Sequence, residues 1–228
     1  SSDETTIIQM INQINESLMF EYHHRLLSFG TRYTGSNNCT RAAEDIYNSF
    51  EQMGLDTKFH EWHYDGYYSK DVVATLYGTD ENSTAEYILC AHYDTVASSP
   101  GADDDGSGTA AVLTIAHVLS QYHFNHTIRF ITFSGEEVGT YGSFTYARDA
   151  RNHGDNIVAV LNMDMIGYAS TTEGGRILRF YPPSRSRWIG DYATSISEKY
   201  NEIIDMRIDT LPSYRGADNQ VFVDYGFD

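Results

Sequence analysis

The chain has 228 residues and a formal charge of −17 at neutral pH, and its length fits one α/β domain with a substantial core. Such an acidic chain is a poor match for nucleic acid or anionic membrane surfaces, both of which attract basic patches. We predict no membrane-spanning helix, because no run of about eighteen apolar residues occurs. The two cysteines exclude a disulfide-rich scaffold and a cysteine-based zinc finger.

The first third of the chain is predicted to form two helices and a hairpin. Apolar residues at helical spacing predict one helix across residues 4–29. A second helix is expected over residues 37–53, with Gly54 as its C-terminal stop. Residues 57–64 and 71–77 then have the composition of two strands, which we expect a Gly-Tyr turn to join.

Two histidines of the first predicted strand, His60 and His63, are separated by an odd number of positions. They therefore lie on opposite faces of the strand and cannot share a metal ion. We interpret both as structural. Cys90 lies in an apolar run typical of a buried strand, and whether it pairs with Cys39 stays open at this point.

Three apolar strands are predicted in the central region, at residues 86–90, 128–134 and 157–163. Each is followed directly by polar groups that suit a metal site. These groups are His92, Asp94 and Asp103–Asp105 after the first strand, Glu136 and Glu137 after the second, and Asp164 after the third. In open α/β sheets the crevice outside the carboxyl ends of the strands binds ligands.

The composition of these segments points to zinc. Neutral imidazole and carboxylate oxygens both suit Zn²⁺, and one carboxylate can bridge two ions. The alternative is a solvated acidic loop before the helix expected at residues 109–119, because Asp, Gly and Ser also form loops. Adjacent glutamates such as Glu136 and Glu137 usually form a solvated face. At the end of a strand, however, one can hold a metal ion while its neighbour faces a metal-bound water.

The last third is predicted to contain a strand at residues 176–181, an amphipathic helix at 184–200 and a short strand at 204–208. There are no internal repeats and no low-complexity linker. We therefore predict one domain that spans residues 1–228.

Four ordered motifs carry a resemblance to a known family. In chain order they read AHYD, PGADDDGSG, FSGEEVGTYGS and NMDMIG. This series resembles the co-catalytic di-zinc aminopeptidases of the bacterial leucyl aminopeptidase type, whose relatives include glutamate carboxypeptidase II, the transferrin receptor and glutaminyl cyclase. The segment RYTGS at residues 32–36 is also similar to the family's N-terminal R-x-x-G-S element.

The resemblance implies a role for each motif residue. The positions that match the family's metal ligands are His92, Asp104, Glu137 and Asp164. Among them, Asp104 matches the carboxylate that bridges two zinc ions. Glu136 matches the general base, and Asp94 matches the acid that orients His92 by a hydrogen bond to its ring.

Three departures from the family pattern leave these positions intact. Asp103 stands where the family often has Asn, and Thr140 stands where a Leu is common. Residues 216–222 resemble the family's S-D-H-x-x-F segment, but Asn219 replaces its His. We do not assign that segment to the metals.

The resemblance implies an α/β/α sandwich around a mixed, mostly parallel sheet. It also implies a zinc-dependent exopeptidase that removes N-terminal residues from peptides, with Glu136 activating a metal-bound water. A carboxypeptidase of this fold stays open, because Arg185, Arg187 and Arg215 could bind a terminal carboxylate. A glutaminyl cyclase and a non-catalytic, metal-poor binding module are further alternatives.

The family's fifth ligand is a His that follows the S-D-H-x-x-F segment and one more strand. No His occurs after His153 here, so we expect the chain to be cut short at its C-terminal end. By analogy, His92, Asp104 and Asp164 hold one zinc, whereas Asp104 and Glu137 alone remain for the other. We therefore expect one firmly held zinc and little activity from this chain on its own.

Four N-x-S/T sequons favour a secreted, extracellular location; they begin at Asn15, Asn38, Asn82 and Asn125. The partner that the resemblance implies is a peptide substrate. Neither the oligomeric state nor the side-chain preference follows from the sequence.

Overall fold

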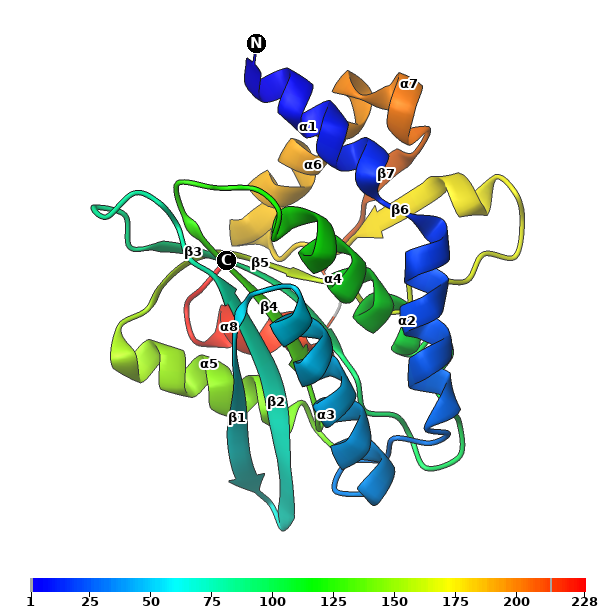
Figure 1. Ribbon diagram of the computed structural model, residues 1–228, viewed down its shortest axis with the longest axis vertical. Coiled ribbons are helices and arrows are strands. Elements are labelled where there is room, and N and C mark those ends of the chain that lie inside the picture. Colours follow the sequence, from blue (N-terminus) through cyan, green and yellow to red (C-terminus); the bar gives the residue numbers. More distant parts are fainter. Residues whose placement is uncertain (1, 214) are drawn as a thin grey trace.

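The computed structural model describes residues 2–213 and 215–228. Its main sheet has five strands in the order β1-β2-β4-β3-β5, and a second sheet consists of β6 and β7 (Figure 1). The strands are β1 (Asp56–Tyr64), β2 (Tyr67–Leu76), β3 (Ala85–His92), β4 (Thr127–Phe133), β5 (Asn156–Asn162), β6 (Ile177–Phe180) and β7 (Arg207–Thr210).

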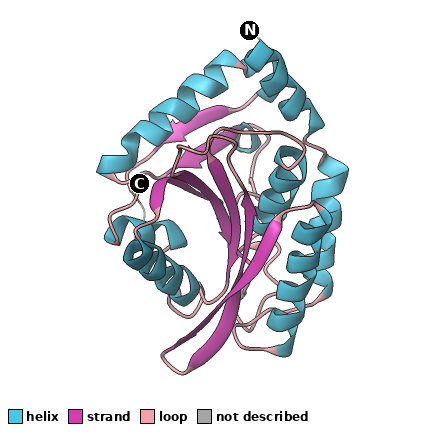
Figure 2. Ribbon diagram, turned by 60° about the vertical axis from the view of Figure 1, so that its left-hand side comes forward, coloured by secondary structure: helices cyan, strands magenta, loops and turns pink. Residues whose placement is uncertain are grey.

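Helices cover both faces of the main sheet, as Figure 2 shows. One face packs against α3 and α4, with α2 outside α4, and the other face packs against α5 and α8. The helices are α1 (Ser2–Gln13), α2 (Glu16–Ser28), α3 (Asn37–Gln52), α4 (Gly106–Leu119), α5 (Tyr141–His153), α6 (Arg187–Lys199), α7 (Asn201–Ile204) and α8 (Asp218–Asp224). Short 3₁₀ turns occur at Gly174–Arg176 and Ser184–Ser186. This arrangement confirms the predicted α/β/α sandwich.

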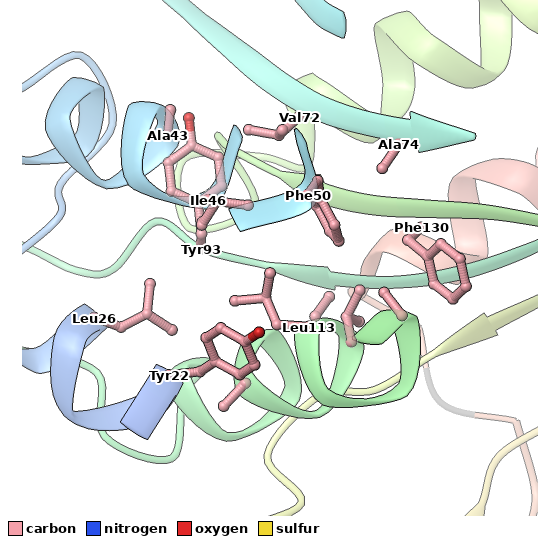
Figure 3. Packing of buried hydrophobic residues seen from close by; sticks show 14 of the residues in the cluster. Tyr22, Leu26, Ala43, Ile46, Phe50, Val72, Ala74, Tyr93, Leu113 and Phe130 are labelled. Atoms are coloured by element: carbon pink, nitrogen blue, oxygen red, sulfur yellow. The ribbon is translucent and has the colours of Figure 1, made fainter. Parts of the chain in front are cut away.

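Alternating residues of the central strands build a separate core on each face, because successive side chains of a strand point to opposite sides. Phe130 of β4 packs into the core beneath α2, α3 and α4, where Phe50 and Leu113 also lie (Figure 3). The next residue, Ile131, packs with Phe222 into the core beneath α5 and α8.

The sheet is mixed. β3 pairs in parallel with both β4 and β5, whereas β2 pairs antiparallel with both β1 and β4. The carboxyl ends of β3, β4 and β5 therefore meet at one edge. Within the described residues, no helix is both long and apolar enough to cross a membrane.

Three local predictions need correction. The helix predicted over residues 4–29 is two helices, because the Asn15 side chain accepts hydrogen bonds from the backbone N–H groups of Ser17 (2.8 Å) and Leu18 (3.2 Å) and caps α2. The hairpin turns at Asp65 and Gly66 instead of Gly-Tyr, since both positions have positive φ (47° and 81°), which Asp-Gly tolerates. The strand expected at residues 204–208 begins only at Arg207, after α7.

Both cysteines are free and buried. Cys39 lies in the core beneath α3, and Cys90 lies in the core beneath α5 and α8. The two thiols thus pack on opposite faces of the sheet, which answers the pairing question that the sequence left open.

Arg32 ties the segment before α3 to the loop that follows β3. Its guanidinium is fully buried and donates hydrogen bonds to the carbonyl oxygens of Tyr93 (2.7 Å), Pro100 (2.7 Å) and Gly101 (3.4 Å). Its backbone N–H also donates to Thr95 Oγ1 at 2.9 Å. One side chain therefore satisfies several carbonyls of the loop that leads to Asp104.

We expect Arg32→Lys to destabilise the protein by about 2 to 4 kcal/mol, because one ammonium cannot reach all of these buried carbonyls and leaves some unpaired. Thermal denaturation measures the loss. Arg151→Lys, at an exposed position of α5, is the matched control and should change the free energy of unfolding by less than about 0.5 kcal/mol. Equal stability of the two variants would contradict this account of the loop.

Candidate metal centre

The strand register brings the predicted site residues together. His92 at the end of β3 lies opposite Phe133 at the end of β4. On the other side of β3, Cys90 lies opposite Asn162, and the Met163 N–H donates to the Cys90 carbonyl at 2.8 Å. The loops that carry Asp104, Glu136 and Asp164 therefore leave the sheet at a common edge.

His92 is buried and has one ring nitrogen bonded and one free. Nδ1 lies 3.2 Å from the main-chain carbonyl of Asp94, and because a carbonyl only accepts, Nδ1 is the protonated nitrogen. Nε2 is buried without a hydrogen-bond partner. It faces Asp104 Oδ1 at 3.1 Å, Glu136 Oε2 at 3.9 Å and Asp164 Oδ1 at 4.0 Å. Anchoring of the second ring nitrogen and a free Nε2 are typical of a histidine that binds a metal.

Three side chains form a compact donor set among the described residues. One ligand atom each from His92, Asp104 and Asp164 lies within 4.8 Å of the other two. One imidazole nitrogen and two carboxylates make a set that fits a tetrahedral zinc site with one open position. A bound cation would explain why Nε2 of His92 is buried without a hydrogen-bond partner.

Glu137 lies outside this compact set, although it lines the same cavity as Asp104 and Asp164. Burial and then the negative charge of Asp104 raise the pKa of the Glu137 carboxyl. Its assignment as a metal ligand therefore stays a prediction.

Glu136 is mostly buried beside His92. Burial and then the charge of Asp218 raise the pKa of its carboxyl to about 8. A carboxyl whose pKa lies near the working pH can both take up and release a proton, which is what a general base and acid must do. Strongly shifted pKa values also cluster at functional sites.

Asp94 supports the turn at Glu136 more directly than it supports the ring of His92. Its fully buried carboxylate accepts hydrogen bonds from the backbone N–H groups of Glu136 (3.2 Å) and Glu137 (3.3 Å) and from Thr34 Oγ1 (2.8 Å). Its Oδ1 lies 3.4 Å from Nδ1 of His92. The hydrogen bond of Nδ1 thus goes to the main-chain carbonyl of Asp94, and the orienting role of the carboxylate stays a prediction.

Asp105 is a supporting residue that the sequence interpretation missed. Its fully buried carboxylate accepts from three backbone N–H groups, those of His92 (3.1 Å), Gly108 (3.0 Å) and Met165 (3.2 Å). It thereby caps α4 and joins the loops after β3 and β5. The Asp-x-x-Gly spacing before the helix was the available signal, since a helix cap bonds the third residue that follows it. Gly108 has no room for a side chain, because a Cβ there would lie 2.0 Å from the Met163 carbonyl oxygen.

Asp218 in α8 was also missed. It is fully buried, and its Oδ1 accepts a hydrogen bond from Ser143 Oγ at 2.6 Å, whereas Oδ2 has no partner. Burial raises the pKa of its carboxyl to about 7. Its neighbour Asn219 lines the cavity. The segment around residues 216–222 thus contributes to the surroundings of the site, although no residue of it belongs to the donor set.

The site opens into a cavity of about 770 Å³. Asp104, Glu136, Glu137 and Asp164 contribute its acidic part. The remainder is largely apolar and includes Met165, Ile166, Tyr168, Ile177 and Phe180. An apolar cleft with a few convergent polar groups is the usual form of a small-ligand site.

Known proteins are similar to this chain in sequence. A protein of Pyrenophora tritici-repentis named "Probable zinc metalloprotease" is 33% identical over 177 residues, which cover 66% of this chain and 36% of that protein. Leucine aminopeptidase 1 of Paracoccidioides brasiliensis is 28% identical over 188 residues, which cover 72% of this chain and 46% of that protein. The chain thus spans less than half the length of these two relatives.

Solved structures agree in fold. The LapA aminopeptidase of Legionella pneumophila matches with a TM-score of 0.86 at 22% identity, over 98% of this chain and 62% of LapA. A glutaminyl cyclase of Porphyromonas gingivalis matches with a TM-score of 0.75 at 18% identity, over 93% of this chain and 80% of that protein. The model of the family described as peptidase family M28 matches residues 71–228, the segment that carries the whole donor set. The chain therefore belongs to peptidase family M28.

Proposed function

We propose that this protein is a zinc-dependent aminopeptidase that hydrolyses N-terminal residues from peptides. The observation that carries the proposal is the buried, unpartnered Nε2 of His92, which faces Asp104 and Asp164 with Glu136 beside it. Relatives named leucine aminopeptidase and zinc metalloprotease support the same activity.

His92, Asp104 and Asp164 would hold one zinc ion, and Asp104 and Glu137 would contribute to a second. When bound, zinc supplies Lewis acidity, which polarises a scissile carbonyl and eases deprotonation of water. The carboxylates of Glu136 and Glu137 follow one another in a turn whose two amides bond Asp94. That turn presents both side chains to the cavity that contains Asp104 and Asp164.

Glu136 is the residue that moves the proton. Its carboxylate accepts a proton from the attacking water and then delivers it to the departing amine. Its mostly buried position raises its affinity for that proton during the transfer. The other acids of the cavity suit the free ammonium of a peptide's N-terminus, which a carboxypeptidase would not need.

The arginines considered for a carboxypeptidase do not favour that alternative. Arg185 donates to Asp228 Oδ1 at 2.6 Å and to the Gly226 carbonyl at 3.1 Å. Arg187 lies 3.9 Å from Asp191 on its own helix. None of Arg185, Arg187 and Arg215 is among the residues that line the cavity, whereas Arg179 is. We retain the aminopeptidase as the proposal because of the acids of the cavity and the names of the relatives.

Substrate choice tests the proposal. The full-length protein with zinc should hydrolyse aminoacyl-p-nitroanilides and leave N-blocked peptides with a free carboxyl end intact. The reverse preference would indicate a carboxypeptidase. Release of ammonia from N-terminal glutamine, without hydrolysis, would indicate a glutaminyl cyclase.

Glu136→Gln should lower the hydrolytic rate by about a hundredfold or more, because the general base is lost. Zinc content should not change, since Glu136 has no ligand role in this assignment. Glu21→Gln, an exposed position on α2, is the control and should retain full activity. Loss of zinc from the Glu136 variant would mean that Glu136 and Glu137 exchange roles.

Asp94→Asn should weaken zinc binding by about tenfold to a hundredfold, as changes beside metal-bound histidines do. The Asn side chain would also place its N–H₂ group next to a backbone N–H donor of the turn, and two donors cannot form a hydrogen bond with each other. Competition with a chelator measures the affinity. Asp191→Asn, at an exposed position of α6, should bind zinc like the unmodified protein; the same affinity for both variants would refute the role of Asp94.

We expect the isolated chain to hold one zinc ion firmly, because one compact donor set is present among the described residues. Equilibrium dialysis followed by metal analysis gives the stoichiometry, and Asp164→Asn should abolish the tight binding. Weak hydrolysis by the isolated chain is expected for the same reason. Two tightly held ions, or brisk hydrolysis, would show that another residue completes the set around Asp104 and Glu137.

A further inference from the structure

A charged pair in the β1–β2 hairpin lies outside the metal centre and takes no part in the mechanism described above. His60 Nδ1 lies 2.8 Å from Asp71 Oδ2, and His60 Nε2 lies 3.2 Å from Asp149 Oδ2. Because ionised carboxylates only accept hydrogen bonds, both ring nitrogens donate. When both carboxylates are ionised, the ring of His60 is an imidazolium held between them. Burial raises the pKa of the Asp71 carboxyl, so the ion pair exists at a pH above that raised pKa and below the pKa of His60.

The surroundings of His60 favour its charged form. Burial lowers the pKa of the ring, but the hydrogen bonds and charges of Asp71 and Asp149 outweigh that effect and raise it. The ring packs edge-on against Tyr146 of α5 at a centroid distance of 5.4 Å. Arg148 donates a hydrogen bond to Asp149 at 3.0 Å.

The other oxygen of Asp71 reaches the strand that leads to Glu136. Asp71 is fully buried, and its Oδ1 accepts from the backbone N–H of Ser134 (3.0 Å) and from the indole N–H of Trp62 (3.2 Å). Gly142 packs closely against Asp71 and leaves no room for a side chain, because a Cβ on Gly142 would lie 2.2 Å from Oδ1 of Asp71. Asp71 therefore fixes the backbone two residues before Glu136.

Two buried carboxylates, one within a strand and one in a loop, thus hold one turn. Asp94, after β3, binds the amides of Glu136 and Glu137, whereas Asp71, in β2, binds the amide of Ser134. A buried carboxylate stays ionised when hydrogen-bond donors or a counter-charge stabilise it, and otherwise it takes up a proton. The imidazolium of His60 is the counter-charge that contacts Asp71.

We propose that His60 and Asp71 are positioning residues for Glu136, and that their ion pair sets the backbone of the turn from which the base acts. The inference rests on the proposed function, because it gives Glu136 the role of general base. Neither residue touches the donor set or the substrate in this assignment.

The pair also gives the turn a pH dependence with a defined sign. A histidine whose pKa is raised in the folded state stabilises that state fully below its unfolded pKa of about 6.5. The contribution is lost as the pH rises through the folded-state value. Above that point Asp71 lacks its counter-charge, and its hold on Ser134 weakens.

The test compares His60→Gln with His63→Gln in the full-length, zinc-loaded protein. Gln keeps a donor for Asp71 but carries no charge, and His63, three residues further along β1, is exposed. We expect kcat to fall about tenfold to a hundredfold in the His60 variant, with KM and zinc content unchanged, as misplacement of a catalytic group predicts. The His63 variant should keep its kcat within about twofold.

Two readouts separate positioning from general destabilisation. Amide hydrogen exchange at Ser134 and Glu136 should speed up in the His60 variant and not in the His63 variant. Asp149→Asn keeps the His60–Asp71 bond but removes one carboxylate, so the ring titration seen by NMR and the alkaline limb of the kcat profile should shift together to lower pH.

Unchanged kcat and unchanged exchange in the His60 variant would overturn the inference, as would an Asp149 variant whose ring titration moves while the kcat profile does not. Failure of the proposed function gives a different result. In that case the unmodified protein shows no zinc-dependent hydrolysis, or Glu136→Gln retains it, while the exchange rates still report whether the ion pair holds the turn.

Discussion

The buried negative charge around one imidazole is the constraint on which the rest of this structure depends. Asp94, Asp105 and Asp218 are fully buried near His92, and Glu136 and Asp164 are mostly buried. An unpaired carboxylate in a protein interior is unfavourable by several kcal/mol. The chain offsets much of this with backbone amides, two on Asp94 and three on Asp105. Asp104 and Asp164 face Nε2 of His92 instead, and a divalent cation there would neutralise them.

The acids of this region therefore divide into those that hold backbone and those that remain free for chemistry. Asp71, Asp94 and Asp105 each accept a hydrogen bond from a backbone amide of a loop at the carboxyl edge of the sheet. Because those amides belong to the loops that carry the reactive side chains, the acids that bind backbone set the geometry of the reactive acids. This arrangement depends on the parallel pairing of β3 with β4 and β5, which brings three strand ends to one edge of the sheet.

Much of this was predictable from the sequence because strand periodicity and strand-end chemistry are local signals. The three central strands, the helix after β3 and the convergence of His92 with acids from three strand ends all follow from them. The choice of Asp104 among Asp103–Asp105 came from the family resemblance. The break at Asn15 and the positions of Asp71 and Asp218 did not follow. Asn15 acts through a cap that overrides a continuous apolar spacing. Asp71 and Asp218 act through contacts with residues 63 and 75 positions away, which no local pattern records.

The difference between acids that bind backbone and acids that face His92 also explains how the fold tolerates a site that lowers its stability. Carboxylates that hold loops gain hydrogen bonds on folding, so they contribute to stability as well as to geometry. Asp104 gains from its contact with His92, which lowers the pKa of its carboxyl. Glu136 and Asp164 gain little without a cation, and the repulsion among the acids opposes folding. The raised pKa values of Glu136 and Asp164 express that repulsion together with burial. The hydrogen bonds of Arg32, Asp94 and Asp105 stabilise the loops that carry the metal centre. They thereby offset the unfavourable free energy of the acids in the centre itself. Because the supporting bonds do not involve the reacting atoms, the centre can keep its unsatisfied groups free for ligand without losing its shape.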